Sequence, residues 1–417
     1  MKTNTNTKTK IFVSAFACIP NCGSESGVGW HWVIEMAKYF EVWALVHKEQ
    51  VVDIEKYVKE HKLEDEIHFI YYDIPFNSLF FKNGLFRWVR TYYHIWTFMS
   101  NKIVKRTMRQ HGITIFHHLT FGNALWPISS YGQKQIFIWG PIGGLETIPA
   151  EYSCRYGIKS RILESVRRFI VSTQKYNPAF ISRCRNANLI LCKTEATMQV
   201  IPIKYKDKAL LFTDVAVEKI NSQENKSLSN KFLRYITVGH LDAWRGFDIL
   251  IEAFAAALNQ YPDMQLTIIG DGLDRLRLEK LIIQIKCSEN IEIVGRIGAC
   301  EYQKFMKECD VVINSCLKEG AVTVSFDSMS YGKPLICIDT GGFTRYFTND
   351  YAVIIPRCEK RKVLIEKVTD AILLLSNDEI RTNMGNAAKN AGQEFTWGHK
   401  GVEIHKIITK TLTIHKF

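Results

Sequence analysis

Short runs of Val, Ile and Leu recur along the chain, and several are followed by a segment whose apolar residues repeat with helical spacing. The runs are apolar at consecutive positions, which is typical of parallel strands that helices bury on both faces. The expected strands lie at residues 11–17, 42–46, 67–72, 113–117, 135–139, 189–192, 235–238, 265–269, 291–294, 311–315 and 335–338. The clearest expected helices lie at residues 29–40, 247–260 and 273–285. This alternation predicts two doubly wound α/β domains.

A polar stretch interrupts the alternation near the middle of the chain. Residues 218–230 contain few apolar side chains and no periodicity, which is typical of a linker. We therefore expect an N-terminal domain over residues 1–220, a linker at 221–230 and a C-terminal domain over 231–393. Two domains also agree with a length of 417 residues, of which 47% are hydrophobic.

The net charge of +12 is concentrated in the N-terminal half of the chain. Residues 1–220 hold 29 of the 54 Lys and Arg but only 18 of the 42 Asp and Glu. No acidic residue occurs between Asp73 and Glu146. A positive face of this kind attracts phosphates, nucleic acid or an anionic membrane surface.

The eleven cysteines include no Cys-x-x-Cys pair and no spacing suited to a zinc site. Reduced thiols in a cytoplasmic protein are the simplest explanation. No apolar stretch approaches the ~20 residues needed to span a bilayer. We expect a cytoplasmic protein, either free or attached peripherally to the inner face of the cytoplasmic membrane.

In doubly wound domains ligands bind at the carboxyl ends of the strands, so the turns that leave the strands carry the candidate chemistry. The first such turn, residues 22–30, reads Cys-Gly-Ser-Glu-Ser-Gly-Val-Gly-Trp and opens a helix. Its glycines allow close approach of a ligand, and the free amides at the helix start suit a phosphate. The candidates are Gly23, Ser24, Glu25 and Gly27, and the alternative is a tight turn without a ligand.

Two further turns lie in the second half of the chain. In residues 238–246, His240 and Arg245 are placed to reach a diphosphate together, unless both are simply solvated. The turn Gly-Asp-Gly-Leu-Asp-Arg at 270–275 lacks the last glycine of a dinucleotide fingerprint. A nicotinamide site is therefore disfavoured.

The fourth turn, at residues 318–334, follows an apolar strand and runs into a short helix ended by Gly332 and Pro334. Glu319 lies in the loop, and Asp327 follows eight residues later inside the helix. A loop carboxylate beside helix-start amides can hold a polyhydroxylated ring and a phosphate at once, and the helix carboxylate can bind a ribose diol. The alternative is that both are ordinary surface acids.

Taken in order, these motifs resemble a known family. They read Val-Gly followed by Arg-Gly-Phe-Asp at 238–248, Ile-Ile-Gly-Asp-Gly at 268–272, Gly-Arg-Ile at 295–297, Glu-Gly-Ala-Val-Thr-Val-Ser-Phe-Asp-Ser-Met-Ser-Tyr-Gly-Lys-Pro at 319–334 and Gly-Gly at 341–342. The set is similar to the retaining nucleotide-sugar glycosyltransferases of group 1, or GT4. The N-terminal half resembles a branch of that family with Gly-Ser-Glu-x-Gly-Val-Gly-Trp at 23–30 and Trp-Gly-Pro-Ile-Gly-Gly at 139–144.

The resemblance implies a GT-B architecture, in which two Rossmann-like domains face each other across a cleft and the C-terminal domain holds the donor. Residues 394–417 resemble the family's closing helix, which crosses back to the first domain. The resemblance also implies a UDP- or GDP-linked sugar as donor substrate and retention of anomeric configuration. We expect no cofactor and no metal, because cationic side chains and amides can stabilise the leaving diphosphate and the chain has no Asp-x-Asp motif.

Family members carry a Glu-x7-Glu pair, whose first carboxylate contacts the donor sugar and whose second binds ribose. Glu319 matches the first, and Asp327 replaces the second with a shorter acid. The basic residues of the family's phosphate turn correspond to His240 and Arg245. We expect both to receive the leaving diphosphate, together with the amides of Gly320, Ala321, Val322, Thr323 and Val324.

Two roles are assigned less directly. The nucleotide base is expected near Gly272, Arg296 and Ile297 through backbone contacts. His118, at the end of an expected strand on the acceptor side, is a catalytic candidate, or else it forms a structural pair with His117.

Residues 82–109 place apolar and basic side chains on opposite faces of an expected helix. The apolar face, which includes Leu85, Trp88 and Trp96, either packs on the sheet or enters an anionic lipid surface. A second basic cluster in residues 155–168 supports the lipid interpretation. Such a surface suits a polyprenyl-linked or lipopolysaccharide acceptor.

The sequence therefore predicts a metal-independent, hexosyltransferase-type retaining glycosyltransferase that acts on a glycan or lipid-linked acceptor in bacterial surface polysaccharide synthesis. The alternatives are a GT-B nucleotide-sugar epimerase and a catalytically silent protein that binds nucleotide or nucleic acid. Because no RNA or DNA motif is present, we expect no nucleic-acid partner.

Overall fold

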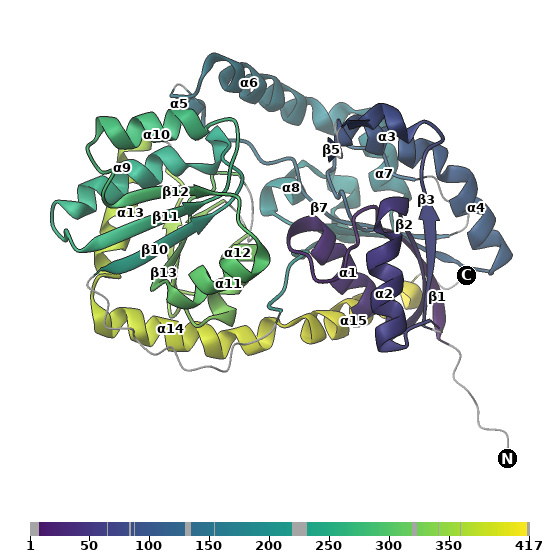
Figure 1. Cartoon of the computed structure of the whole chain (residues 1–417). Coiled ribbons are helices and arrows are strands. Elements are labelled where there is room, and N and C mark those ends of the chain that lie inside the picture. The colour runs from purple at the N-terminus through teal and green to yellow at the C-terminus, as the bar shows by residue number, and fades with distance from the viewer. Residues whose placement is uncertain are drawn as a thin grey trace.

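A computed structural model gives the fold of the chain (Figure 1). It describes residues 8–414, except 65, 83–84, 87, 130–134, 154, 219–231, 319–322, 341 and 359. The linker expected at 221–230 thus lies outside the described residues.

The first half folds around a parallel sheet with the strand order β3-β2-β1-β6-β7-β8-β9. Its strands are β1 (Thr9–Ser14), β2 (Phe40–His47), β3 (Ile67–Tyr72), β6 (Ile115–His118), β7 (Ile136–Ile142), β8 (Leu189–Cys192) and β9 (Ala209–Leu211). Its helices are α1 (Ser24–Ala37), α2 (Val51–His61), α3 (Val89–Met99), α4 (Asn101–Gln110), α5 (Ala150–Ser153), α6 (Ile158–Thr173), α7 (Pro178–Asn186) and α8 (Glu195–Val200). A small antiparallel pair, β4 (Phe81–Lys82) and β5 (Leu85–Phe86), lies outside the sheet.

The second half folds around a parallel sheet with the order β12-β11-β10-β13-β14-β15. Its strands are β10 (Leu233–Val238), β11 (Met264–Ile269), β12 (Ile291–Gly295), β13 (Val311–Asn314), β14 (Leu335–Asp339) and β15 (Ala352–Pro356). Its helices are α9 (Phe247–Leu258), α10 (Arg275–Gln284), α11 (Ala299–Glu308), α12 (Thr323–Ser330), α13 (Arg361–Leu374) and α14 (Asp378–Gly392). The chain ends in α15 (Trp397–Ile414).

Both sheets have a hydrophobic core on each face, which explains the consecutive apolar positions of their strands. In β1, Ile11 and Val13 enter one core while Phe12 enters another. In β10, Tyr235 and Ile236 likewise lie in different cores. The predicted pair of doubly wound α/β domains is therefore confirmed.

Each sheet has one point at which the strand order reverses. In the first sheet it lies between β1 and β6, and in the second between β10 and β13. The crevice outside the carboxyl ends of such strands is where ligands of doubly wound sheets bind. The topology alone thus selects the turns after β1 and β6 and the turns after β10 and β13.

The structure contains two strands that were not expected, and one expected helix starts later than expected. The short edge strands β9 and β15 were not predicted, because three residues are too few to show a pattern and β15 is partly exposed and ends in Pro356. The helix face expected from Leu85 was wrong at its start, since α3 begins at Val89. Trp88 adopts a left-handed backbone conformation with φ 55° and is 77% exposed.

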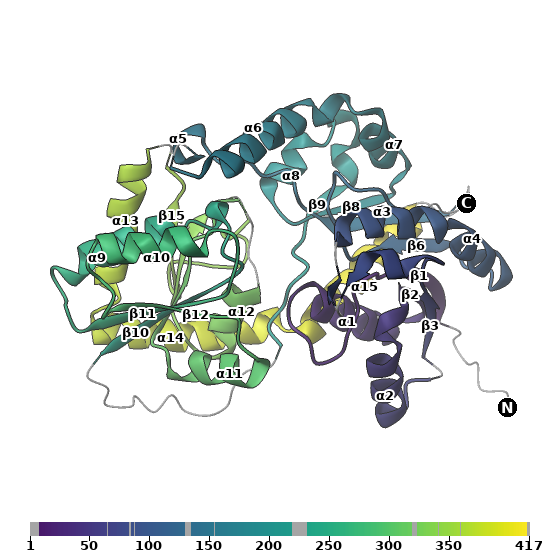
Figure 2. The ribbon, with the colours of Figure 1, turned by 45° about the horizontal axis from the view of Figure 1, so that its top comes forward.

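The two halves are joined at several places. Segment α5–α6 leaves β7 and crosses between the domains (Figures 1 and 2). Its start is anchored in the C-terminal core by Ile148, Tyr152 and Tyr156. At the other end of the chain, α15 packs against α1, where a Cβ on Gly401 would lie 2.8 Å from Glu35 Oε2.

Candidate functional site

The turn after β10 packs directly on the turn after β13, at the switch point of the C-terminal sheet. The Ser315 hydroxyl donates to the Arg245 carbonyl at 2.9 Å, and the Leu317 amide donates to the Trp244 carbonyl at 3.2 Å. Gly246 has φ 72°, and a Cβ there would lie 2.3 Å from the Ser315 carbonyl oxygen. Only glycine allows this approach, so two turns about 70 residues apart form one surface.

Arg245 is half-buried in the turn after β10. Its guanidinium carbon is 4.5 Å from the centre of the Trp244 ring, and a Cβ on Gly239 would lie 3.7 Å from it. His240 is exposed, with Nδ1 3.3 Å from Asp242 Oδ2. A permanent cation next to a glycine backbone can receive an anionic group without steric obstruction.

The turn after β11 packs beside the turn after β10, at the carboxyl ends of these two neighbouring strands. The Leu241 amide donates to the Asp271 carbonyl at 3.0 Å, and a Cβ on Gly272 would lie 2.5 Å from the Leu241 carbonyl oxygen. Arg296 is exposed and Ile297 half-buried just after the end of β12. The structure thus places all three expected base-binding residues after neighbouring strands of the sheet.

Helix α12 starts beside β13. Asn314, the last residue of β13, donates from Nδ2 to Ser325 Oγ at 3.1 Å, and Val324 is buried. Thr323 is half-buried at the first position of the helix. Four of the expected donor-site residues lie outside the described residues: Glu319, Gly320, Ala321 and Val322.

Asp327 is half-buried on α12 and accepts a hydrogen bond of 2.6 Å from the Tyr302 hydroxyl of α11. Burial raises the pKa of Asp327 to about 7, the Tyr302 hydrogen bond opposes this rise and the charge of Glu218 adds to it. Near neutral pH this carboxyl group is therefore present both in its protonated form, which can donate a hydrogen bond, and in its ionised form, which accepts hydrogen bonds. Either form can bind a ribose diol.

The raised pKa of Asp327 predicts how the stability of the protein depends on pH. Between about pH 4 and pH 7 the folded protein keeps a proton on Asp327 that the unfolded chain has released, so the free energy of unfolding should fall as pH rises through this window and level off above it. Asp327→Asn should remove that part of the slope. Denaturation across this pH range measures it, with the exposed Asp350→Asn as control. Equal slopes in wild type and Asp327→Asn would contradict the assignment.

The candidate turn of the N-terminal domain is held by backbone contacts. A Cβ on Gly27 would lie 1.8 Å from the Cys22 carbonyl oxygen, whereas one on Gly23 would meet nothing within 4 Å. Ser24 has φ 60°, and Glu25 Oε1 accepts from the Phe121 amide at 2.7 Å. Glu25 therefore ties the start of α1 to the loop after β6, across the switch point of this sheet.

The histidine pair at the end of β6 is buried. His117 Nε2 lies 2.6 Å from the Gly140 carbonyl oxygen, and His118 Nε2 lies 3.3 Å from the Tyr93 hydroxyl. Burial lowers the pKa of His117 to about 4 and that of His118 to about 3. Both rings are neutral at physiological pH and enclosed by protein, which favours the structural role of His118 over the catalytic one.

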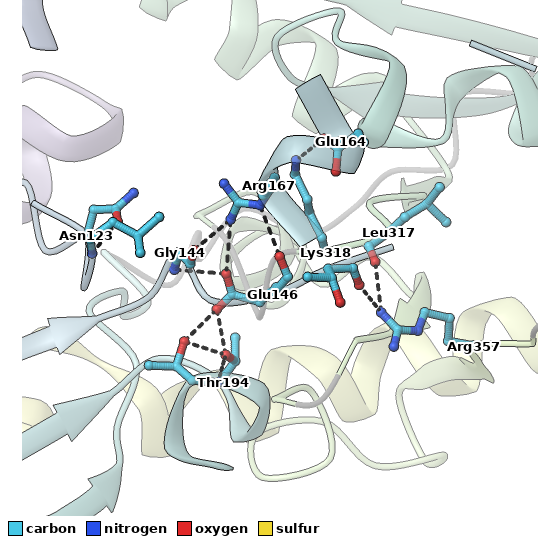
Figure 3. Close-up of polar contacts among 12 residues, drawn as sticks. Asn123, Gly144, Glu146, Glu164, Arg167, Thr194, Leu317, Lys318 and Arg357 are labelled. Atoms are coloured by element: carbon cyan, nitrogen blue, oxygen red, sulfur yellow. Dashed lines mark hydrogen bonds and ion pairs between the residues drawn. The ribbon is translucent and has the colours of Figure 1, made fainter. Parts of the chain in front are cut away.

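Sequence reasoning missed a polar network at the carboxyl ends of β7 and β8 (Figure 3). Buried Glu146 accepts from the hydroxyls of Thr194 at 2.6 Å and Thr197 at 2.9 Å, and from the Gly144 amide at 2.8 Å. Arg167 of α6 donates to the carbonyls of Gly144 and Glu146. A signal was present, because Glu146 is the first acid after the long stretch without any.

The network continues into the C-terminal domain through Lys318, which directly precedes Glu319 in the chain (Figure 3). Lys318 Nζ lies 2.5 Å from Glu164 Oε1 of α6 and 4.6 Å from the centre of the Trp244 ring. Both charged side chains are more than nine-tenths buried, and burial lowers the pKa of Lys318. The turn after β13 is thus fixed from one side by Trp244 and from the other by α6.

No group of three or more His, Cys, Asp or Glu is placed to hold a metal ion within the described part of the chain. Over the same residues, no helix combines the length and the hydropathy needed to cross a membrane.

Comparison with known proteins finds a family match to the domain that holds these turns. Residues 218–391 match the family of glycosyl transferases group 1. The match covers the turns after β10, β11 and β13 together with α12, so the expected donor-site residues all lie within it.

Two curated relatives match a similar region. An uncharacterized glycosyltransferase of Methanocaldococcus jannaschii is 24% identical over 222 residues, which are 53% of this chain and 59% of that protein. The N-acetylgalactosamine-N,N'-diacetylbacillosaminyl-diphospho-undecaprenol 4-alpha-N-acetylgalactosaminyltransferase of Campylobacter jejuni is 23% identical over 241 residues, 57% of this chain and 62% of that enzyme. The chain thus spans less than two thirds of the length of these relatives.

The fold is shared over nearly the whole chain. The structure of HepE from Anabaena, solved in complex with UDP, superposes with a TM-score of 0.57 at 13% identity and covers 96% of this chain and 100% of HepE. This likeness confirms the GT-B fold that was expected from the sequence.

Proposed function

We propose that the protein is a retaining glycosyltransferase that moves a sugar from a nucleoside-diphosphate donor to a glycan or lipid-linked acceptor in bacterial surface polysaccharide synthesis. The observation that carries the proposal is the joint surface of the turns after β10 and β13, at the switch point of a domain that matches group 1 glycosyltransferases. Gly239 and the Arg245 guanidinium lie at this surface, and α12 starts beside it. Free amides at a helix start and a guanidinium are the groups that bind a diphosphate.

Breaking the bond between the sugar and the diphosphate adds negative charge to the leaving group and gives the sugar oxocarbenium character. We assign the leaving diphosphate to Arg245, His240 and the first amides of α12, which stabilise charge as it develops. Glu319 is assigned to orienting the sugar and Asp327 to the ribose. A UDP donor is supported by the UDP complex of HepE, and the base would lie against Gly272.

The lipid-linked acceptor is supported by the Campylobacter relative, which is named as acting on a diphospho-undecaprenol. It is supported further by the excess of basic residues in the N-terminal half. Peripheral attachment to an anionic membrane surface is part of the proposal, because an acceptor with a lipid tail is held there.

A thermal-shift panel of nucleoside diphosphates and their sugars, each with and without EDTA, tests the donor site. We expect one base to raise the melting temperature, since a ligand at a hundredfold excess over Kd stabilises by ~2.7 kcal/mol. EDTA should leave the shift unchanged, because the site uses side chains and amides in place of a metal. A panel without any shift would overturn the proposed donor class, and a shift abolished by EDTA would overturn metal independence.

A further inference from the structure

Helix α6 has an unusual orientation: six of its apolar side chains are exposed, whereas Glu164 is buried and Arg167 is half-buried against the protein. Ile158 is 76% exposed, Leu163 66% and Phe169 69%. The other exposed apolar residues of this helix are Ile162, Val166 and Ile170. A helix on the surface of a globular protein normally has the opposite arrangement, with its apolar stripe against the core.

The charged side chains that face inward have defined partners. Glu164 forms the buried ion pair with Lys318, and Arg167 donates to the carbonyls of Gly144 and Glu146 (Figure 3). These contacts fix the rotation of α6 about its axis. The outward position of Ile162, Val166 and Phe169 is therefore a property of the fold.

The position of α6 makes this apolar face accessible. The helix spans the upper edge of the molecule, between α5 on the C-terminal domain and α7 on the N-terminal domain, in both views (Figures 1 and 2). Exposed apolar residues gathered on one face in this way indicate an interaction site.

The charge around the face indicates which partner it takes. Residues 155–176 contain six Lys and Arg and a single acid, Glu164, which is buried against Lys318. A second copy of the chain would bring the same basic rim against itself, because a two-fold contact pairs identical patches. An apolar stripe flanked by Lys and Arg matches an anionic lipid surface, where the stripe enters the acyl boundary and the cations contact phosphates.

The other candidate segment does not present such a face. On α3, Tyr92 and Trp96 are fully buried in the core of the N-terminal domain, so the apolar face expected within residues 82–109 is used for packing. Of the described side chains assigned to that face, Trp88 is exposed. The apolar surface of α6 is therefore the better candidate for the lipid contact.

We infer that α6 lies flat in the headgroup region of an anionic lipid surface, with Ile162, Val166 and Phe169 inserted and Lys159 and Arg161 at the phosphates. The inference specifies the membrane partner named in the proposed function and is independent of the proposed reaction. Because Glu164 holds Lys318, the lipid-facing helix is also connected to the turn that carries the donor-site residues.

Vesicle flotation tests the inference on the full chain, without substrate. Wild type should float with vesicles of phosphatidylcholine and phosphatidylglycerol and stay behind with phosphatidylcholine alone. The double variant Ile162→Asp/Phe169→Asp should lower the bound fraction about tenfold or more, since two apolar anchors become charged. Lys159→Glu/Arg161→Glu should weaken binding and remove its dependence on the anionic lipid.

Val52→Asp is the matched control, because Val52 is 72% exposed on α2, on the far side of the N-terminal domain from α6 (Figure 2). It should float like wild type. Wild type that ignores anionic vesicles, or an Ile162→Asp/Phe169→Asp variant that still binds them, would overturn the inference. So would self-association that this variant abolishes, which would assign the face to a second copy. The nucleotide-induced thermal shift of the α6 variant should equal that of wild type, which separates this outcome from a failed donor site.

Discussion

Replacing Arg245 by methionine should lower the rate of nucleoside-diphosphate release from the donor about 10²- to 10³-fold, the usual effect of removing one preorganised donor from developing negative charge. Methionine keeps an unbranched aliphatic stem, while the guanidinium and its contact with the Trp244 ring are lost. The release rate of Arg245→Lys should lie between those of wild type and Arg245→Met, because an ammonium group restores the charge but not the bidentate geometry. A coupled assay for the released nucleotide measures all three.

The matched control for this variant is Arg234→Met. Arg234 lies near the start of β10, the strand that leads into the turn of Arg245, and its Nη1 is 3.4 Å from Glu308 Oε2. It carries the same charge but lies at the amino end of the strand, away from the turns after β10 and β13, so its loss should leave the rate within a factor of about two. Equal losses at both positions would show that the effect is not specific to the carboxyl edge of the sheet.

Breaking the ion pair between Lys318 and Glu164 should have the largest effect on stability. Lys318→Met leaves a buried carboxylate and Glu164→Gln leaves a buried ammonium, and each should cost about 3 kcal/mol of unfolding free energy. The double variant Lys318→Met/Glu164→Leu should recover most of this loss, because no uncompensated charge remains buried. Urea denaturation of the four proteins measures the effect.

Lys362→Met provides the comparison, since Lys362 pairs with Glu366 at 4.0 Å on an exposed helix face. This variant should change the unfolding free energy by less than ~0.5 kcal/mol. If Lys318→Met proved equally mild, the pair would not join α6 to the turn after β13 as the structure indicates. Additive losses in the double variant would lead to the same conclusion.

Much of the fold could be predicted because the strands have cores on both faces. Phe12 and Ile236 lie on opposite faces from their apolar neighbours, and this produces consecutive apolar positions that are visible in the sequence. Two strands were missed because β9 has three residues, too few to show a pattern, and β15 is partly exposed and ends in Pro356. The helix expected around Trp88 started too early, because periodicity does not show where the backbone leaves the helical region.

The parts of the site that follow strands at the switch point could be predicted from the sequence. The parts that depend on contacts between residues far apart in the chain could not. Gly246 and Arg245 follow a strand at the switch point, so the neighbouring turn after β13 could be expected beside them. The hydrogen bond between Asp327 and Tyr302 joins two helices and leaves no pattern in the sequence. The orientation of α6 was equally hidden, because its decisive contact pairs Glu164 with a residue 154 positions away.

Hydrogen–deuterium exchange of the full chain, with and without a saturating nucleoside diphosphate, tests the central claim most directly. If the diphosphate is held between the turns after β10 and β13, protection should increase in peptides that cover 239–246 and 323–327, and peptides that cover α2 should not change. Protection confined to the N-terminal domain, or absent from both turns while the nucleotide is bound, would contradict the account.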